Sequence, residues 1–267
     1  MPLEVGFLGY GRMAQAISEG LDRAKTIPYA NQAASDILLD QLKSLASQRG
    51  IVAMPNNLEL MSQCPVVIIA VKPHQVLPVL TKSRETRKGQ LFISIAAGIS
   101  LAELESWLPP QVSVIRVIPN LPALVGRGVT LICAKPGTPL ESLARAREIF
   151  QSVGVTVDLD ETRFDEGMAV SGSGPAYFFL VMEALIRGAA RLGLSWETAR
   201  ELVLRTAQGA AETALARPDL ALADLRDQVA SPGGTTAEAL YVLEEGAVTA
   251  LFQEALRAAT AKAKKLA

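Results

Sequence analysis

The sequence has few of the residues that bind metals or form disulfides. Its 267 residues include two cysteines, Cys64 and Cys133, and one histidine. Two cysteines this far apart do not make the disulfide framework of a small secreted domain, and with one histidine they lack the ligand spacing of a zinc site. We therefore expect no metal site and a reducing compartment, the cytoplasm.

The sequence also has no excess of positive or negative charge and no long hydrophobic run. Lysine and arginine total 26 and aspartate and glutamate 27, so the net charge is −1 and no basic footprint for nucleic acid or anionic membranes is expected. No run reaches ~18 apolar residues, and Met1–Gly6 lacks the basic segment of a signal peptide. Hydrophobic residues nevertheless make up 49% of the chain, enough for a sizeable core. We expect a globular protein with neither a nucleic-acid nor a membrane partner.

The first part of the chain alternates short apolar runs with polar, helix-like stretches. Helices are expected at Met13–Ala24, Ser35–Arg49 and Ser100–Trp107, the last with Ser100 as its N-cap and Glu103 completing a capping box. Strands are expected at Leu3–Leu8, Ile27–Ala30, Val66–Val71, Leu91–Ala96, Val112–Val117 and Gly128–Ala134. Nearly continuous apolar strands that alternate with helices predict an α/β fold, a Rossmann-type doubly wound domain with a mostly parallel sheet.

The composition and the spacing of apolar residues change from about Glu161 onward. Pro175–Leu192, Trp196–Arg217 and Thr235–Lys265 are rich in Ala, Leu and Glu, with apolar residues at helical spacing. We expect a dinucleotide-binding domain over residues 1–160 and an all-α dimerisation and substrate domain over residues 161–267. Helices this apolar need a cover; a second copy of the chain is the simplest one, although the first domain can supply part of it.

A glycine-rich turn closes the first expected strand. Gly9, Gly11 and Ala14 match the dinucleotide fingerprint, in which the glycines allow a tight turn and a close pyrophosphate, and the third position allows close helix packing. The helix that follows would offer unpaired N–H groups to the phosphates. A glycine turn without a ligand is the alternative, but the placement after an apolar strand at the start of the chain favours a nucleotide site.

The end of the second expected strand bears on the choice of coenzyme. NAD sites carry an acidic residue there for the ribose hydroxyls. The segment Tyr29–Ser35 holds no carboxylate, and Asn31, Gln32 and Ser35 can hydrogen-bond a 2′-phosphate. This favours NADPH, with NADH left open because no arginine follows and Asp36 is not far away.

Polar residues also follow later strands, at the edge where open α/β sheets bind ligands. Lys72 and His74 lie in the segment Ala70–His74. His74 is either one half of a catalytic pair or part of a solvated strand end, and the lack of an evident acidic partner favours the second. Asn120, between two prolines, is either a fixed polar group or part of a simple turn.

Two glycine-containing loops lie in the second part of the chain. The segment Ser171–Ala176 is typical of a helix start, with Pro175 at its first turn. The segment Val229–Thr236 runs a Pro-Gly-Gly turn into a helix and would present successive N–H groups and hydroxyls. Holding a substrate carboxylate and capping the helix both remain open for this loop.

Taken together, these motifs resemble the pyrroline-5-carboxylate reductase family. The resemblance covers essentially the whole chain, through the glycine turn, Ala70–Pro73, Ile115–Asn120, Ser171–Tyr177 and the most specific segment, Asp227–Thr236. It implies hydride transfer from NAD(P)H to C5 of 1-pyrroline-5-carboxylate, which gives L-proline. The chain departs from the family pattern at Leu121, where threonine is common, and at Asn31–Gln32 after the second strand.

The resemblance also implies roles for particular residues. Thr236 would be the catalytic residue near the ring nitrogen, and Gln228 stands where the family often has an asparagine that faces the cofactor. The implied substrate-binding residues are Glu161, Ser231, Gly233, Gly234, Thr235 and Thr236. The implied cofactor-binding residues are Gly9, Gly11, Arg12, Met13, Asn31, Gln32, Asn57, Ala70, Val71, Lys72, Pro73, Ala97 and Gln228.

The implied chemistry suits a chain without a catalytic histidine pair. A protonated cyclic imine is already electrophilic, so its reduction needs orientation more than a metal or a strong acid. A β-hydroxyacid dehydrogenase would need a lysine in the first C-terminal helix, and Pro175–Leu192 has none. A nucleotide-sensing or vitamin B6-handling protein is the non-catalytic alternative, which intact glycine and substrate loops disfavour. We expect a homodimer with active sites near the subunit boundary, and assembly beyond the dimer is left open.

Overall fold

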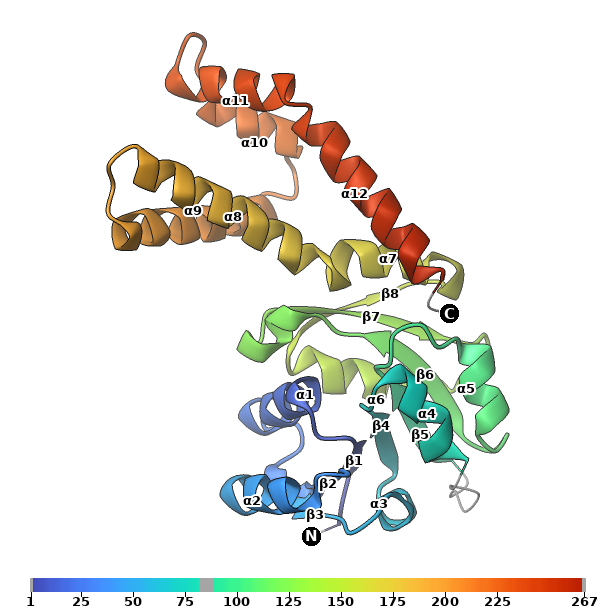
Figure 1. Ribbon diagram of the computed structural model, residues 1–267. Coiled ribbons are helices and arrows are strands. Elements are labelled where there is room, and N and C mark those ends of the chain that lie inside the picture. The colour runs from blue at the N-terminus through green and yellow to red at the C-terminus, as the bar shows by residue number, and fades with distance from the viewer. Residues whose placement is uncertain (1, 82–88, 266–267) are drawn as a thin grey trace. The chain divides into compact units, whose positions relative to one another are not determined.

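The computed structural model describes residues 2–81 and 89–265 (Figure 1). The chain divides into two compact units, Met1–Ser173 with Ala259–Ala267, and Gly174–Ala258. The boundary between the two units, at residues 173–174, lies further along the chain than the change in composition at Glu161. The two units are described separately below.

The first unit is built on one eight-stranded sheet in the order β3-β2-β1-β4-β5-β6-β7-β8. Neighbouring strands are parallel except for β6 and β7, which pair antiparallel. The strands are β1 Val5–Leu8, β2 Gln32–Ser35, β3 Val52–Ala53, β4 Val66–Ile69, β5 Leu91–Ser94, β6 Ser113–Ile118, β7 Gly128–Ala134 and β8 Gly154–Asp158. This sheet confirms the expected doubly wound α/β fold.

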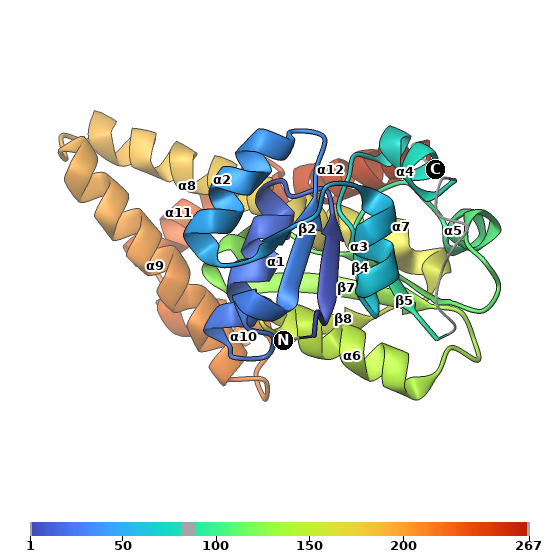
Figure 2. The same cartoon turned by 90° about the horizontal axis from the view of Figure 1, so that it is seen from below.

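Helices cover both faces of this sheet (Figure 2). Along the strands, side chains such as Phe7 point to one face and Leu8 to the other, so both faces are buried and the strands are apolar almost throughout. The helices that contribute to the core on the side of Phe7 are α1 Arg12–Arg23, α2 Leu39–Arg49 and α6 Leu140–Gln151. Those on the side of Leu8 are α3 Asn57–Gln63, α4 Pro73–Leu80 and α5 Leu101–Trp107.

The second strand differs from the expectation. Ile27–Ala30 is not a strand: its last two residues begin a 3₁₀ turn, η1 Tyr29–Asn31, and β2 follows at Gln32–Ser35. The Gln-Ala-Ala-Ser segment has little strand propensity, but it lies buried between β1 and β3 and pairs with both. Because tertiary pairing decides here, the carboxyl end of β2 falls at Ser35.

The capping box at the start of α5 is confirmed. The Ser100 hydroxyl accepts a hydrogen bond from the Glu103 backbone N–H at 3.2 Å, and the Glu103 carboxylate accepts one from the Ser100 N–H at 2.8 Å. The Ser100 hydroxyl also donates to Glu103 Oε2 at 2.7 Å, and this bond, together with the one from the Ser100 N–H, holds the pKa of Glu103 below its ordinary value because both favour the ionised carboxylate. The start of this helix is therefore set by local sequence.

The second unit is helical. Its helices are α8 Gly174–Arg191, α9 Trp196–Ala216, α10 Leu222–Val229, α11 Thr235–Glu245 and the greater part of α12 Val248–Ala263. The single helix expected at Thr235–Lys265 is wrong, because the chain breaks at Gly246 and Ala247, where Ala247 has a φ of 53°. Helices α8 and α9 pack against each other as a hairpin (Figure 1).

Large apolar side chains are exposed along these helices. They include Phe178, Phe179, Leu180 and Leu185 on α8, Leu202 on α9, Tyr241 and Val242 on α11, and Leu251 on α12. The helical stretch Glu161–Arg191 contains an 18-residue window with a mean hydropathy of 1.4, which by length and composition alone is enough to cross a membrane. It includes the 3₁₀ turn η3 Glu161–Arg163, α7 Phe164–Gly167 and a π-helical turn, Met168–Gly172. Exposed apolar side chains of this kind need another protein surface to pack against them in solution.

Candidate functional site

The glycine turn joins β1 to α1. Gly9 has a φ of 87°, and a Cβ there would lie 2.9 Å from Val71 Cγ1 and 3.0 Å from the Ala70 carbonyl oxygen. Gly11 is the N-cap of α1, and a Cβ there would meet no atom within 4 Å. Ala14 is buried in the core between α1 and the sheet. Gly9 is thus required by the turn itself, whereas Gly11 leaves space free in front of the helix N-terminus.

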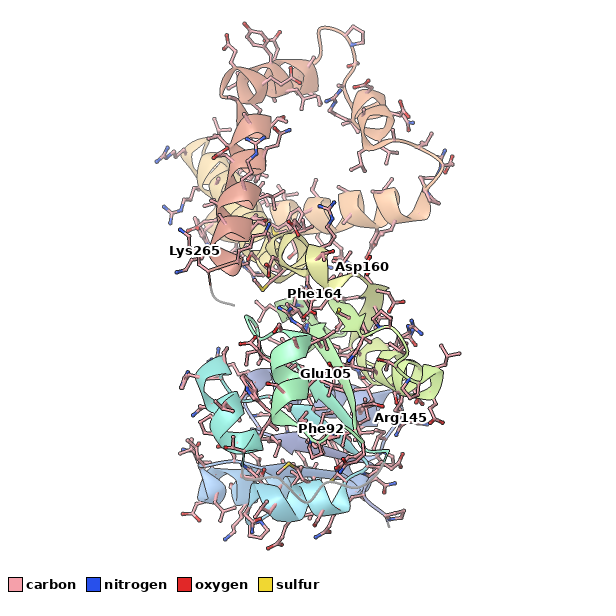
Figure 3. The ribbon with its side chains drawn as sticks, turned by 90° about the vertical axis from the view of Figure 1, so that its right-hand side faces the viewer. Phe92, Glu105, Arg145, Asp160, Phe164 and Lys265 are labelled. Atoms are coloured by element: carbon pink, nitrogen blue, oxygen red, sulfur yellow. The ribbon has the colours of Figure 1, made fainter. Side chains whose placement is uncertain are left out.

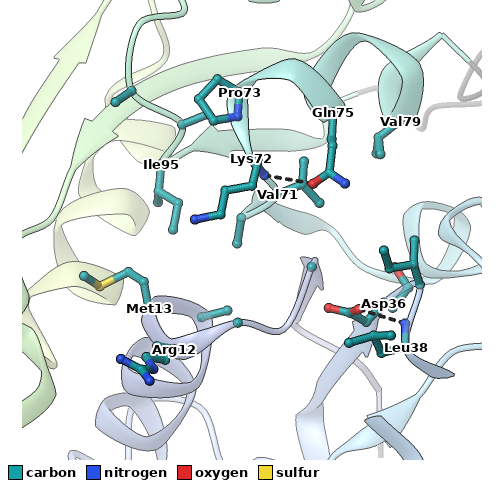
Figure 4. Close-up of a pocket in the computed structure, with 18 of the residues that line it drawn as sticks. Arg12, Met13, Asp36, Leu38, Val71, Lys72, Pro73, Gln75, Val79 and Ile95 are labelled. Atoms are coloured by element: carbon teal, nitrogen blue, oxygen red, sulfur yellow. Dashed lines mark hydrogen bonds between the residues drawn. The ribbon is translucent and has the colours of Figure 1, made fainter. Parts of the chain in front are cut away.

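That free space belongs to a cavity of about 600 Å³ in the first unit (Figure 4). It lies at the carboxyl ends of β1, β2, β4 and β5, where open α/β sheets bind their ligands. The N-terminus of α1, with its unpaired N–H groups, opens into it. Its lining residues are Gly9, Gly11, Arg12, Met13, Ala14, Ser35, Asp36, Ile37, Leu38, Asn57, Ala70, Val71, Lys72, Pro73, Gln75, Val79, Ile95, Ala96, Ala97, Leu121 and Leu124.

Most of the residues expected to bind the cofactor line this cavity. They are Gly9, Gly11, Arg12, Met13, Asn57, Ala70, Val71, Lys72, Pro73 and Ala97. The exceptions are Asn31, Gln32 and Gln228, of which Gln228 is exposed on α10 in the other unit. Sequence reasoning thus identified four separate segments that the fold brings to one edge of the sheet.

Asn31 and Gln32 require a correction. Gln32 is the first residue of β2 and fully buried, and its side chain donates to the carbonyl oxygens of Ser18 at 3.1 Å and Ile27 at 2.8 Å. Asn31 donates to Glu4 at 2.7 Å. Both therefore lie at the amino end of β2, whereas the cavity lies at the carboxyl end. The error follows from placing the second strand one segment too early.

The residues that stand at the carboxyl end of β2 are Ser35 and Asp36. The Ser35 hydroxyl donates to Asn57 Oδ1 at 2.6 Å. Asp36 Oδ2 accepts from the Tyr10 backbone N–H at 2.8 Å, and Oδ1 accepts from the Leu38 N–H at 3.0 Å. Ser35 was already among the residues expected near the 2′-phosphate, and a correct second strand would have added Asp36, but no sequence signal marked Val79 or Leu124 as lining.

Lys72 and His74 both lie at the start of α4, but in different surroundings. Lys72 lines the cavity, and its backbone N–H donates to Gln75 Oε1 at 3.3 Å (Figure 4). His74, in the first turn of α4, is exposed and does not line the cavity. This placement favours the solvated reading of His74 over a catalytic pair.

Glu161 lies in a partly buried network instead of the cavity. One of its oxygens accepts from the Leu101 N–H at 2.7 Å and from Arg116 at 3.0 Å, and the Arg116 side chain is only 5% exposed. Arg116 also lies over the ring of Phe164, 4.7 Å from its centroid (Phe164 is labelled in Figure 3). Burial is the main reason that the pKa of nearby Cys133 is raised to about 11, with the Glu161 charge adding to it. Glu161 thus has a structural role, and its substrate role stays a prediction.

Asn120 is a fixed polar group between strands. Its amide donates to the Ser171 carbonyl at 2.9 Å and accepts from the Val129 N–H at 2.8 Å. The next residue, Leu121, begins the 3₁₀ turn η2 Leu121–Val125 and lines the cavity. The departure from threonine at this position therefore places an apolar side chain at the cavity wall.

The expected substrate loop forms a tight turn in the second unit. The Gly234 N–H donates to the Ser231 carbonyl at 3.0 Å across Pro232 and Gly233, and Gly233 has a φ of 70°. This is the pattern of a type II turn, which favours proline and then glycine. Gly234 is the N-cap of α11, so Thr235 and Thr236 stand in its first turn, with Thr236 half-buried. The loop presents helix N–H groups and hydroxyls, as an anion site requires.

A glycine turn in front of a helix, a cavity at the switch edge of a mostly parallel sheet and a lysine at that edge define a class of protein, the dinucleotide-binding proteins of Rossmann type. The open space at Gly11, which a Cβ would fill, fits a dinucleotide pyrophosphate.

Comparisons with known proteins agree with this class. A family model described as pyrroline-5-carboxylate reductase dimerisation matches residues 161–266, and one described as NADP oxidoreductase, coenzyme F420-dependent, matches residues 4–98. The pyrroline-5-carboxylate reductase of Pseudomonas aeruginosa is 39% identical to this chain, and the aligned region covers 98% of this chain and 96% of that protein. This chain belongs to the pyrroline-5-carboxylate reductase family.

Solved structures of the family also resemble this fold. A pyrroline-5-carboxylate reductase from Coxiella burnetii has a TM-score of 0.91 and 36% identity, covering 100% of this chain and 99% of the other. A pyrroline carboxylate reductase from Plasmodium falciparum, solved with NADP bound, has a TM-score of 0.89 and 31% identity, covering 99% of this chain and 98% of the other. The family resemblance inferred from the motifs is therefore confirmed.

Proposed function

We propose that this chain reduces 1-pyrroline-5-carboxylate to L-proline with NAD(P)H as the hydride donor, the last step of proline biosynthesis. The observation that carries the proposal is the glycine-turn cavity at the sheet edge, in a chain that is similar over its whole length to reductases of this substrate. NAD(P)H supplies a hydride, and the protein supplies binding and orientation.

The cavity residues have distinct tasks in this proposal. The pyrophosphate would take the space in front of Gly11, where the N-terminus of α1 favours negative charge. Residues that follow β4 and β5, Lys72 and Ala97 among them, would hold the nicotinamide half, because β4 and β5 lie on the opposite side of β1 from β2. The apolar wall at Leu121 would keep water from the ring.

The substrate loop would hold the other reactant. Backbone N–H groups at Gly234 to Thr236 suit the carboxylate of the substrate. Thr236 would position the ring nitrogen. When hydride adds to C5 of the protonated imine, the electron pair of the C=N bond moves to nitrogen and gives the neutral amine, which then takes up a proton from solvent. A site with no histidine among its described lining residues is adequate for this reaction.

The helices of the second unit supply the partner surface in this proposal. The family model over residues 161–266 is one of dimerisation, which supports homo-oligomerisation. We propose that a second copy covers the exposed apolar side chains of α8, α9, α11 and α12 in a homodimer, which would be a soluble cytoplasmic enzyme. A monomer at micromolar concentration in sedimentation would contradict this.

The activity is tested by mixing the purified chain with 1-pyrroline-5-carboxylate and NADH or NADPH while absorbance at 340 nm is followed. A steady fall is expected with at least one coenzyme. A flat trace in the presence of measurable coenzyme binding would reject the reductase and favour a nucleotide-binding protein without turnover.

The role of Thr236 is tested with a pair of variants. Thr236→Ala should lower kcat/KM by ~10- to 100-fold, the loss of one or two hydrogen bonds in the transition state. Thr236→Ser keeps a hydroxyl and should recover most of this loss. Coenzyme affinity should be unchanged in both. If Thr236→Ala retains full kcat/KM, Thr236 has no part in the reaction.

A further inference from the structure

A carboxylate stands in the coenzyme cavity at the carboxyl end of β2. Asp36 directly follows Ser35, the last residue of that strand, and lines the cavity half-buried (Figure 4). Its two oxygens accept hydrogen bonds from the backbone N–H groups of Tyr10 at 2.8 Å and Leu38 at 3.0 Å. The side chain is therefore held in one orientation between the glycine turn and the start of α2.

This position is the one that meets the adenosine ribose in Rossmann-type sites. The bond from Tyr10, a residue of the glycine turn, holds the Asp36 carboxylate beside the place that the pyrophosphate would take. An ionised carboxylate accepts about four hydrogen bonds, and the two backbone bonds leave capacity for the ribose hydroxyls. A 2′-phosphate in the same place would bring negative charge against it and would replace the 2′-hydroxyl that NADH can donate.

Positive charge in the cavity lies elsewhere. Among the described lining residues, the cations are Arg12 and Lys72. In Figure 4, Arg12 lies beside Met13, well apart from Asp36 and Leu38. The segment after β2 continues from Asp36 with Ile37, Leu38, Leu39 and Asp40, so it carries no basic residue before Lys43. Nothing described at the Asp36 end of the cavity would neutralise a 2′-phosphate.

We propose that Asp36 makes NADH the preferred coenzyme of this chain over NADPH. This rests on the proposed function, for which the cavity binds a nicotinamide dinucleotide. The sequence favoured NADPH because Tyr29–Ser35 lacks a carboxylate, but β2 ends at Ser35, and the residue at the discriminating position is Asp36. Asp36 thereby selects between two coenzymes that differ only in the 2′-phosphate.

The test is direct binding without substrate, by isothermal titration of the full-length chain with NADH and NADPH. The wild-type chain should bind NADH ~10-fold or more tightly than NADPH, as expected for one or two hydrogen bonds to a charged group. AMP and 2′,5′-ADP, used as fragments, should show the same order of affinity. If the wild-type chain binds NADPH more tightly than NADH, the proposal is overturned, whatever the variants do.

Variants locate the preference at Asp36. Asp36→Asn keeps the size of the side chain and removes its charge, and it should shift the NADH-to-NADPH affinity ratio ~10- to 100-fold toward NADPH. Asp36→Glu keeps the charge and should keep NADH preferred. Asp40→Asn is the matched control: Asp40 is exposed, four residues further on and outside the lining. It removes the same charge and should leave the ratio within ~3-fold, since exposed charges are screened.

The remaining outcomes are also decisive. Equal shifts in Asp36→Asn and Asp40→Asn would overturn the proposal, because the preference would then come from general charge. Failure to bind either coenzyme would overturn it together with the proposed function. NADH preference without reduction of 1-pyrroline-5-carboxylate would refute the proposed function alone and support the role of Asp36.

Discussion

Gly11→Val separates the folding of the glycine turn from its binding of the coenzyme. Gly11 has a φ of −73° and a ψ of −175°, extended backbone that any residue adopts. A Cβ at this position meets no atom within 4 Å. A Cβ at this position therefore requires neither backbone strain nor displacement of a neighbour, and a side chain there would enter the cavity in front of the α1 N-terminus.

The expected magnitudes differ sharply for binding and stability. A side chain in front of the helix N-terminus displaces the pyrophosphate from two or more N–H groups, and each charge-assisted bond is worth about 1.5–3 kcal/mol. Losing two such bonds lowers coenzyme affinity by at least ~100-fold. The melting temperature should fall by no more than about 2–4 °C, since valine is a poorer N-cap than glycine but its Cβ displaces no neighbour.

The matched control is Gly9→Val, two residues earlier. Gly9 needs its φ of 87°, and its Cβ would press on the Ala70 backbone oxygen at 3.0 Å. This variant should lose about 1–3 kcal/mol of stability from strain in addition to binding.

Calorimetric titration with NADH and NADPH, and thermal unfolding of both variants, check this pair of expectations. Wild-type affinity in Gly11→Val would refute the placement of the pyrophosphate at this turn. Equal thermal losses in the two variants would refute the distinction between the two glycines.

Two further substitutions test the scaffold around the site by urea unfolding. Ser100→Ala removes the N-cap of α5 and should lower the free energy of unfolding by about 1 kcal/mol. The stability that comes from the depressed pKa of Glu103 is present above the ordinary glutamate pKa and is lost as the pH falls. The difference in free energy of unfolding between the wild-type chain and Ser100→Ala should therefore become smaller in acid. Glu161→Gln leaves the Arg116 cation, 5% exposed, without a charged partner and should cost about 2 kcal/mol or more. Glu148→Gln, in the more exposed pair with Arg145, should cost at most about 0.5 kcal/mol, and equal losses would contradict a structural role for Glu161.

Much of the fold follows from local patterns. The near-continuous apolar runs at β1, β4, β5, β6 and β7 are typical of strands buried on both faces, and each was expected within a few residues of its observed bounds. The Ser100 capping box and the start of α9 at Trp196 were likewise predictable, because a helix begins where a side chain can satisfy its first N–H groups.

The coenzyme cavity contains residues that such patterns identify and residues that they do not. Its glycine turn and the segment Ala70–Pro73 carry recognisable signals because turn geometry and strand ends restrict the residue types allowed. Val79, Ile95 and Leu124 carry none, since an apolar residue that lines a cavity has the same sequence character as one in the core.

The sequence by itself determined five of the strands, β1, β4, β5, β6 and β7, the glycine turn and the family resemblance, because these depend on neighbours along the chain. Only the tertiary structure decided where β2 lies. Its four residues have weak strand propensity and become a strand by pairing between β1 and β3, both distant in sequence. That pairing shifts the strand end from Ala30 to Ser35 and brings Asp36, instead of Asn31 and Gln32, to the cavity. Long-range contacts of this kind leave no periodic trace in the segment they organise.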